Sequence, residues 1–335
     1  MTTLRKPSYN REPIGSIEAL SRVLGLPVEE LTVLASEAES LYRAGTKVDK
    51  ADGSVRETID ALPRLKKIQK RIQLCILNHV CFPKYLQGSI RDKYNRRDHI
   101  ANAAIHARAK IVFNEDIAKF FPSTREKFIR SMWQHFFQFP PAVAEILTRL
   151  TTKDGVLPQG THTSPLIANL IFWDVECDTE AMFRARGFNY SRYIDDVTVS
   201  ARRAIRGTEK SFVVRVIMQM MAKKSLHANR SKHRIFTSGH RMVVNNQNVN
   251  GSKPSLPQKK RSAIRAAVRE CELQASQGRY GELYRKMFDS VSGRVAEYER
   301  LHPIPGLELR KRLIPIPPIK PKGSGQNKLV NSLYL

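Results

Sequence analysis

The stretch FNYSRYIDDVTVSA, residues 188–201, decides the fold of this chain. Its flanks FNYSR and VTVSA have the composition of short strands, which predicts a hairpin with Asp195 and Asp196 at its tip. A hairpin tip can present adjacent carboxylates together, whereas within a strand they would point to opposite faces. Neighbouring carboxylates repel and raise each other's pKa unless cations neutralise them, so the pair indicates divalent metal ions. An isolated Asp-Asp would be better explained as a polar turn.

A third carboxylate in a matching context favours the metal site over the turn. The stretch KIVFNED, residues 110–116, predicts a strand that ends in Asp116. Phosphoryl transfer to a 3′ hydroxyl uses two metal ions about 3.5–4 Å apart, one for the attacking oxygen and one for the leaving pyrophosphate. Three aspartates can hold such a pair, and hard oxygen ligands favour Mg²⁺.

The charge balance points to a polyanionic partner. The 335 residues include 57 Lys and Arg against 31 Asp and Glu, a formal net charge of +26. Nucleic acid is the commonest partner of a protein this basic. A ribosomal or histone-like binder is the alternative, but a hydrophobic fraction of 41% without a basic low-complexity block favours a folded catalyst.

The cysteines and the apolar segments bear on location. Four cysteines, none in a CxxC pair, predict reduced core residues: Cys75, Cys81, Cys177 and Cys271. The N-terminal stretch MTTLRKPSYNREPIGS has no apolar run of a signal peptide, and no uncharged apolar stretch of about 18 residues occurs. We therefore expect a cytoplasmic protein without a membrane partner.

Periodicity and turn signals predict an α+β protein. The expected elements are two short helices within residues 16–41, a hairpin over 46–59 turning at Asp52-Gly53, a helix over 65–79, a basic loop over 91–97, a helix over 211–224, and two helices over 259–277 and 280–301. The stretch DGVLPQGTHTSP, residues 154–165, predicts a turn and then a helix that Ser164 caps and that runs to Phe183.

Two motifs carry a resemblance to a known family. LPQG at residues 157–160, followed by the Tyr-x-Asp-Asp box at 193–196, resembles the reverse transcriptases. The stretch NAAIH, residues 102–106, is similar to the Asn-Ala-x-x-His element of the bacterial retron reverse transcriptases, and similar pieces extend from residue 62 to residue 303. Gly239-His240-Arg241 stands where those enzymes usually carry Val-Thr-Gly.

The resemblance implies a right-hand polymerase fold of fingers, palm and thumb with an N-terminal helical cap. The implied segments are an N-terminal helical region (1–45), fingers with part of the palm (46–110), palm with interleaved fingers elements (111–250), thumb helices (251–312) and a flexible C-terminal tail (313–335).

The resemblance also implies roles for individual residues. Asp116 and Asp195 would be the main ligands of two Mg²⁺ ions, assisted by Asp196 and by the backbone of Ile117. Phe121 would disfavour a 2′ hydroxyl on the incoming nucleotide, although it could be a core aromatic beside Phe120. The remaining nucleotide-binding residues would be Arg56, Lys50, Gln159, Gly160 and Lys232, the last of which could instead be a surface charge.

A basic stripe is expected on the helix over residues 259–277. Arg261, Arg265 and Arg269 recur every four residues, with Ile264 and Val268 offset toward the core. Such a stripe repels itself and is tolerable along a phosphate backbone, so it is predicted to grip RNA or the growing hybrid. A solvated helix face, partly offset by acidic neighbours, is the alternative.

The retron resemblance implies an RNA-directed DNA polymerase that copies part of a structured noncoding RNA with deoxynucleoside triphosphates. It would prime from a 2′ hydroxyl and make a branched RNA–DNA product (msDNA), with an effector (toxin) protein as partner and antiphage defence as the role. The alternatives are another bacterial reverse transcriptase of the group II intron-like, diversity-generating or abortive-infection type, or a catalytically idle RNA-binding scaffold.

Overall fold

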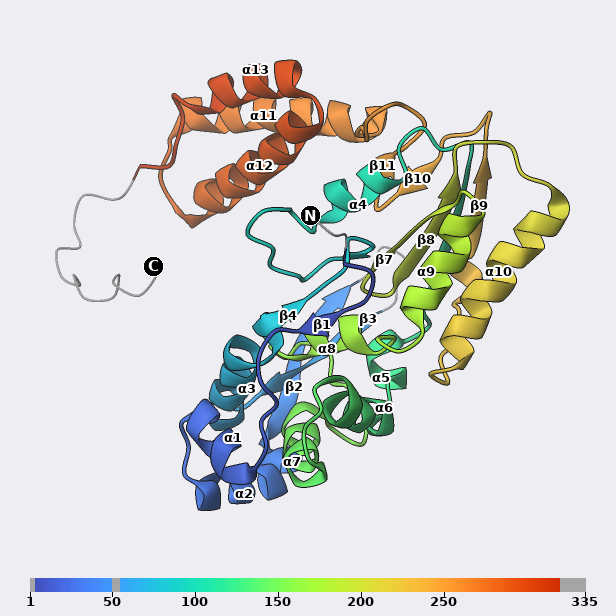
Figure 1. Ribbon diagram of the computed structural model, residues 1–335. Helices are drawn as coiled ribbons and strands as arrows, with labels where there is room; N and C mark the ends of the chain where they lie inside the picture. The colour runs from blue at the N-terminus through green and yellow to red at the C-terminus, as the bar shows by residue number, and fades with distance from the viewer. Residues whose placement is uncertain (1–3, 50–54, 320–335) are drawn as a thin grey trace. The chain divides into compact units, whose positions relative to one another are not determined.

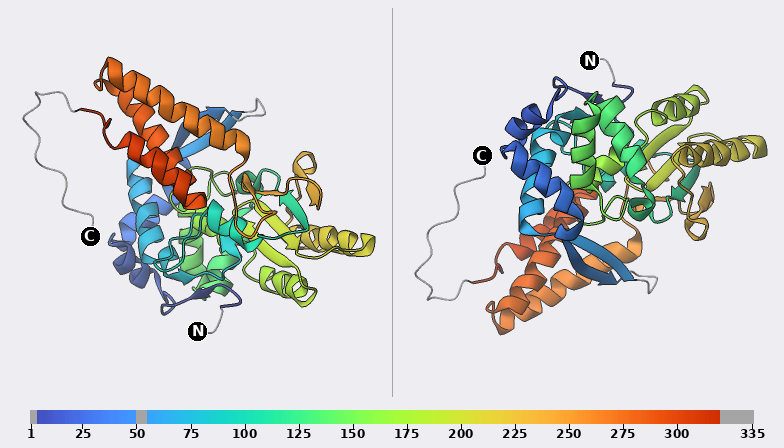
Figure 2. Two further views of the ribbon diagram at one scale, coloured as in Figure 1. Left: turned by 90° about the horizontal axis from the view of Figure 1, so that it is seen from above. Right: turned by 90° about the horizontal axis from the view of Figure 1, so that it is seen from below.

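The computed structural model describes residues 4–49 and 55–319 (Figure 1). The chain divides into two compact units, Met1–Asn245 with Val249–Ser252 and Asn246–Asn248 with Lys253–Leu335. Both helices and sheets contribute, which confirms the mixed α+β content. The views in Figure 2 show the sheets and helices of the first unit and the helices of the second.

A five-stranded sheet in the order β5-β7-β8-β6-β9 organises the first unit. Its strands are β5 (Leu86–Gln87), β6 (Ile111–Asp116), β7 (Asn189–Tyr193), β8 (Asp196–Ala201) and β9 (Arg234–Thr237). β7 and β8 form the expected antiparallel hairpin, β6 is antiparallel to both β8 and β9, and β5 is parallel to β7. Two strands remote in sequence, β6 and β7, therefore flank β8.

Helices cover the two faces of this sheet differently. α9 (Glu176–Ala185) and α10 (Gly207–Ala222) lie over one face, where Phe183 stacks on Tyr190 with ring centroids 5.7 Å apart (Figure 1). Strand side chains alternate between faces, so Ser191 points the other way, toward α4 (His99–Ile105). The same alternation places Asp116 and Asp196, which pair in register, on the α4 side.

The other elements of the first unit precede the sheet, connect its strands or, in the case of β10, follow its last strand. They are β1 (Ser8–Tyr9), α1 (Ile17–Leu24), α2 (Val28–Glu37), η1 (Ala38–Leu41), β2 (Tyr42–Asp49), β3 (Val55–Ala61), α3 (Pro63–Cys75), η2 (Leu77–His79), β4 (Val80–Cys81), α5 (Phe120–Ser123), α6 (Glu126–Ser131), η3 (Met132–Phe136), α7 (Pro141–Thr151), α8 (Ser164–Leu170), η4 (Arg230–Lys232) and β10 (Val243–Val244).

Two expectations for the N-terminal region are confirmed. The first helix ends at Gly25, whose φ of 58° lies in the left-handed region that glycine adopts without strain, and α2 begins three residues later. β2 and β3 pair as an antiparallel hairpin. Its predicted turn at Asp52-Gly53 lies outside the described residues.

The helix expected from Ser164 to Phe183 was wrong in two respects. It is interrupted between Leu170 and Glu176, where α9 begins. Thr163 rather than Ser164 precedes the helix, and the Ser164 hydroxyl pairs with the Thr161 hydroxyl at 2.7 Å. Every residue of α8 except Pro165 is buried, so its apolar run has no polar face that would reveal where the helix stops.

Up to residue 319, the last one described, the second unit is built on three helices and contains the short strand β11 (Gln247–Asn248). The helices are α11 (Gln258–Gln277), α12 (Glu282–Leu301) and α13 (Pro303–Leu313). Residues 313–319, expected to begin a flexible tail, are packed in part: Tyr284 Oη donates to the Ile316 carbonyl at 2.6 Å and Arg279 donates to the Pro315 carbonyl at 2.8 Å. Residues 320–335 of that tail lie outside the described residues.

The cysteines are free thiols, as expected, but only Cys271 is buried, and Cys81 is exposed. The expectation that all four belong to the core was therefore wrong. In the described part of the chain, no helix has the length and apolar character needed to cross a membrane.

Candidate active site

The three aspartates lie together at one end of the central sheet. Asp116 ends β6 and is the register partner of Asp196, the first residue of β8. Directly opposed strand residues have Cβ atoms about 4.5–5.5 Å apart. Asp195 lies in the turn, where its carbonyl accepts the Ile117 N–H at 2.9 Å. The structure thus brings together residues that are about 80 positions apart in the sequence, including the main chain of Ile117.

The electrostatics of this cluster favour cations. Burial, together with the negative charges of Asp195 and Asp116, raises the pKa of Asp196 to about 7. The Lys232 ammonium lies 2.8 Å from Asp116 Oδ1, and this hydrogen bond raises the lysine pKa, so Lys232 is a charged member of the site. One ammonium among three carboxylates leaves excess negative charge at a half-buried place.

The donor set suits hard divalent ions. Carboxylate oxygens on adjoining strands, with a main-chain carbonyl nearby, are the ligands that Mg²⁺ takes in phosphoryl-transfer sites. Within residues 4–49 and 55–319, no group of three or more His, Cys, Asp or Glu side chains lies close enough to hold a metal ion. A bound cation would compete with Lys232 for Asp116.

The segment with Gln159 and Gly160 packs against the β2–β3 hairpin. The Ile59 N–H donates to the Gln159 carbonyl at 2.7 Å. Gly160 has a φ of 118°, and a Cβ there would lie 2.8 Å from the Ile59 carbonyl oxygen, so only glycine allows this approach. Arg56 belongs to the same strand β3, whereas Lys50 lies outside the described residues.

The two neighbouring phenylalanines of α5 have different environments. Phe120 is buried and stacks on Phe172, with ring centroids 6.1 Å apart. Phe121 packs against the edge of the same core but is only partly buried. Of the two rings, Phe121 is thus the one that a ligand can reach.

The stripe on α11 has the expected facial arrangement. Ile264 and Val268 are buried, while Arg265 and Arg269 are exposed and Arg261 is half-buried. These arginines belong to the second unit.

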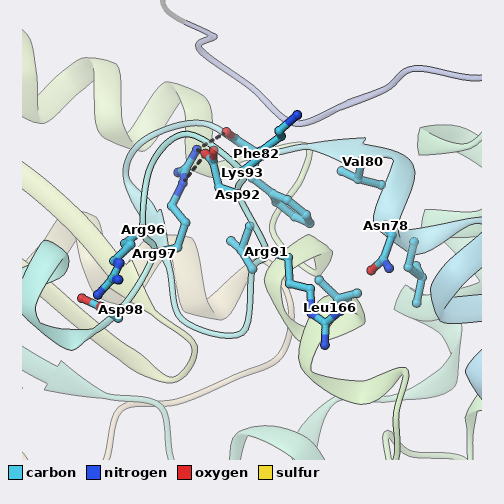
Figure 3. Close-up of a pocket in the computed structure, with 12 residues that line it drawn as sticks. Asn78, Val80, Phe82, Arg91, Asp92, Lys93, Arg96, Arg97, Asp98 and Leu166 are labelled. Atoms are coloured by element: carbon cyan, nitrogen blue, oxygen red, sulfur yellow. Dashed lines mark hydrogen bonds and ion pairs between the residues drawn. The ribbon is translucent and has the colours of Figure 1, made fainter. Parts of the chain in front are cut away.

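Two features of the first unit were not singled out from the sequence. One is the fully buried ion pair of Arg192 with Glu176. The other is a cavity of about 590 Å³ beside the basic loop at residues 91–97 (Figure 3). Apolar residues such as Phe82 and Leu166 line it together with Arg91 and Lys93. The basic composition of residues 91–97 predicts the loop. It does not predict the cavity, because the apolar residues that line the cavity come from other segments of the sequence.

His106, the histidine of the NAAIH stretch, ties α4 to the β7–β8 hairpin. It is fully buried, and its ring nitrogens lie 2.7 Å from Ser191 Oγ on β7 and 2.8 Å from Ser200 Oγ on β8. Burial lowers its pKa to about 3, so the imidazole is neutral in the folded protein near neutral pH.

This depressed pKa predicts an acid-sensitive component of stability. Between pH 6.5 and about 3 the unfolded chain binds a proton at His106 that the folded chain does not, so stability falls as pH falls. The loss is about 1.4 kcal/mol per pH unit, or about 2 kcal/mol at pH 5. Urea unfolding of wild type and His106→Gln at about pH 7.5 and 5 should show a smaller pH difference in the variant. Equal differences would contradict the assignment.

The chain is similar in sequence to known proteins over most of its length. Residues 48–274 match the protein family described as "Reverse transcriptase (RNA-dependent DNA polymerase)". The chain is 31% identical over 319 residues to the Retron Se72 reverse transcriptase of Salmonella heidelberg (strain 579083-10), covering 94% of this chain and 83% of that protein. It is 30% identical over 332 residues to the Retron Ec48 reverse transcriptase of Escherichia coli, covering 96% and 81%.

The family match covers more than half of the chain and includes all three clustered aspartates, and both relatives are matched over most of their length. The expectation of an RNA-directed DNA polymerase is confirmed. The chain belongs to the reverse transcriptase family and, within it, to the retron reverse transcriptases.

Proposed function

We propose that this RNA-directed DNA polymerase copies part of a structured noncoding RNA into DNA that stays covalently joined to the RNA. Synthesis would start from a 2′ hydroxyl of that RNA and yield a branched product, msDNA. The observation that carries the proposal is the cluster of Asp116, Asp195 and Asp196 in a chain with retron relatives across nearly its whole length. The cytoplasm would be its location.

The proposed metal site uses residues that the fold already brings together. Asp116, Asp195 and Asp196, with the Ile117 carbonyl, would hold two Mg²⁺ ions. Such ions activate the attacking hydroxyl and neutralise the leaving pyrophosphate. Lys232, a cation hydrogen-bonded to Asp116, would lie near the leaving phosphates.

The incoming deoxynucleoside triphosphate would lie between this cluster and the β2–β3 hairpin. Gln159 and Gly160 would line its pocket, since their segment joins β3 by a main-chain hydrogen bond. Arg56, and Lys50 beyond the described residues, would bind the triphosphate. We assign the N-terminal helical region, fingers, palm and thumb to the ranges expected from the sequence.

Phe121 would set the choice of sugar, because a partly exposed ring five residues beyond Asp116 in the sequence could collide with a 2′ hydroxyl. Phe121→Ala is expected to raise ribonucleotide incorporation relative to deoxynucleotide by about 10–100-fold, the range for one small group in a packed pocket. The measurement is the ratio of kcat/KM for UTP and dTTP on one template. Phe128→Ala, another half-buried phenylalanine, serves as control. Unchanged discrimination in Phe121→Ala would mean that another residue senses the ribose.

The branched product provides the direct test of the proposal. The protein purified with its nucleic acid is incubated with Mg²⁺ and labelled deoxynucleotides, and the products are separated under denaturing conditions. Label that migrates with RNA and shifts only after ribonuclease treatment supports a covalent RNA–DNA product. Label released by denaturation alone indicates a group II intron-like, diversity-generating or abortive-infection type of activity. No extension would favour an idle RNA-binding scaffold.

The proposed biological role is antiphage defence, with an effector (toxin) protein as partner. The relatives support the retron type of enzyme, and the sequence resemblance implies the rest. Sequencing the co-purifying nucleic acid and the genes beside this one would identify the RNA and the partner.

A further inference from the structure

The turn that carries the catalytic aspartates has an unfavourable backbone. Tyr193 and Asp196 pair across the hairpin, so Ile194 and Asp195 form its two-residue turn. Ile194 has a φ of 58°, whereas Asp195 is not among the positive-φ residues. This pattern, with only the first central residue left-handed, favours glycine at that position, and a β-branched side chain there is strained. Something outside the turn must hold it.

Arg192 supplies that restraint. Its Nη1 donates to the Ile194 carbonyl at 2.9 Å, which fixes the peptide that joins Ile194 to Asp195. On the other side of the turn, the Ile117 N–H donates to the Asp195 carbonyl. Both ends of the strained segment are therefore held by hydrogen bonds that originate outside it.

Every N–H group of the Arg192 guanidinium donates a hydrogen bond. Its other donors bind the Ala168 carbonyl at 3.4 Å, the Asn169 carbonyl at 3.0 Å, and both Glu176 oxygens at 2.7 Å. All five N–H groups thus have acceptors, and Tyr190 Oη also donates to Glu176 at 2.7 Å. Arg192 is fully buried and Glu176 nearly so.

A buried ion pair is weak support for stability, because well-packed apolar residues can replace one without loss. Here the pair joins three places: the end of α8, the start of α9 and the catalytic turn. A planar guanidinium can bind all three at once, whereas a lysine ammonium presents its donors from one atom. The arrangement is therefore better explained if Arg192 orients the turn than if it only fills space in the core.

We propose that the Arg192–Glu176 pair is a positioning device that holds the Ile194–Asp195 peptide so that Asp195 and Asp196 face Asp116 before metal binds. This proposal rests on the metal-site assignment made above. Arg192 touches neither metal nor substrate, and it acts through the main chain of the turn. The aspartates are thereby oriented in advance, which lowers the cost of ordering them around a cation.

The test compares Arg192→Lys with Arg97→Lys in the full chain. Arg97 is a matched control because its side chain is also buried and donates to Asp92 and to the Phe82 carbonyl (Figure 3). It also donates to the carbonyls of Pro83 and Leu86, and none of these acceptors lies in the catalytic turn. Mn²⁺ affinity is measured by electron paramagnetic resonance, and folding by the thermal transition. Arg192→Lys is expected to weaken Mn²⁺ binding by about 10–100-fold, and Arg97→Lys to leave it unchanged. Equal Mn²⁺ affinities in both variants would overturn the proposal.

Adding Ile194→Gly provides a rescue that a purely structural role does not predict. Glycine adopts a positive φ without strain, so Arg192→Lys with Ile194→Gly should recover at least part of the lost Mn²⁺ affinity. Absence of recovery would count against the proposal. If Arg192→Lys does not fold, Glu176→Gln carries the test, because it preserves volume while loosening the guanidinium. Weaker Mn²⁺ binding would support the proposal, and unchanged binding would overturn it.

The metal assignment is checked separately with Asp195→Asn. If that variant binds Mn²⁺ as wild type does, the metal site itself is wrong and the positioning proposal falls with it. If Asp195→Asn loses Mn²⁺ but Arg192→Lys and Glu176→Gln do not, only the positioning proposal fails.

Discussion

Asp195→Asn is expected to abolish DNA synthesis while RNA binding survives. The substitution keeps the side-chain volume but removes a negative charge and one anionic oxygen from the proposed two-ion site. Replacing a residue that hydrogen-bonds to a metal ligand typically lowers activity by about 10–100-fold. Replacing a direct ligand should therefore lower it by more than that range. Primer extension at saturating Mg²⁺ measures the first quantity, and filter binding of the co-purified RNA measures the second.

Asp174→Asn is the control for this substitution. The Asp174 carboxylate pairs with Lys224, just beyond the end of α10, so this variant should retain near-wild-type synthesis. If Asp195→Asn polymerised DNA at the wild-type rate, Asp195 would not be a ligand of the catalytic metal ions. Loss of both synthesis and RNA binding would instead indicate that the substitution disturbs the fold.

Changing Arg261, Arg265 and Arg269 together to Gln is expected to lower the dependence of RNA binding on salt by about two to three units of slope. The reason is that each phosphate left without its arginine keeps about one condensed counterion that binding would otherwise release. A protein that binds about 6–10 phosphates loses roughly 10³–10⁵ in affinity between 50 and 200 mM salt. Fluorescence anisotropy across that range measures both slopes.

The alternative is that acidic neighbours neutralise the arginine stripe on α11. Arg269 lies 3.9 Å from Glu272, but Glu272 makes two bonds of 2.7 Å with Arg312, and this pairing lowers the glutamate pKa. Arg312 therefore neutralises most of the Glu272 charge, and the positive charge of the stripe is left largely unneutralised. Phosphate contacts position RNA and carry little base information, so the loss of affinity should be similar for unrelated RNA sequences.

A second triple variant provides the control. Arg285, Lys286 and Arg294 are exposed on α12, and changing them to Gln removes the same formal charge from the same unit. Its slope should stay close to wild type. If both triple variants lower the slope equally, the second unit attracts RNA through its net charge rather than through the stripe. An unchanged slope in the stripe variant would place RNA binding elsewhere.

The sequence by itself determined the family, the chemistry and much of the local structure. Asp195 and Asp196 were predicted at a hairpin tip and Asp116 at a strand end because strand flanks and turn residues are local signals. The division of residues 16–41 into two short helices and the buried face of α11 followed from turn signals and from helical periodicity. Such features depend on residues within a few positions of each other.

Tertiary structure decided which remote residues meet. Lys232 reaches Asp116 across 116 positions, and Gly160 lies against Ile59 on another hairpin. The interruption after Leu170 was hidden because α8 is buried almost all round and therefore shows no periodicity. Arg192 looked like one more basic residue in a basic chain, yet it is buried and holds the catalytic turn. Periodicity reports whether a side chain faces the core, whereas its partner there depends on how distant segments pack.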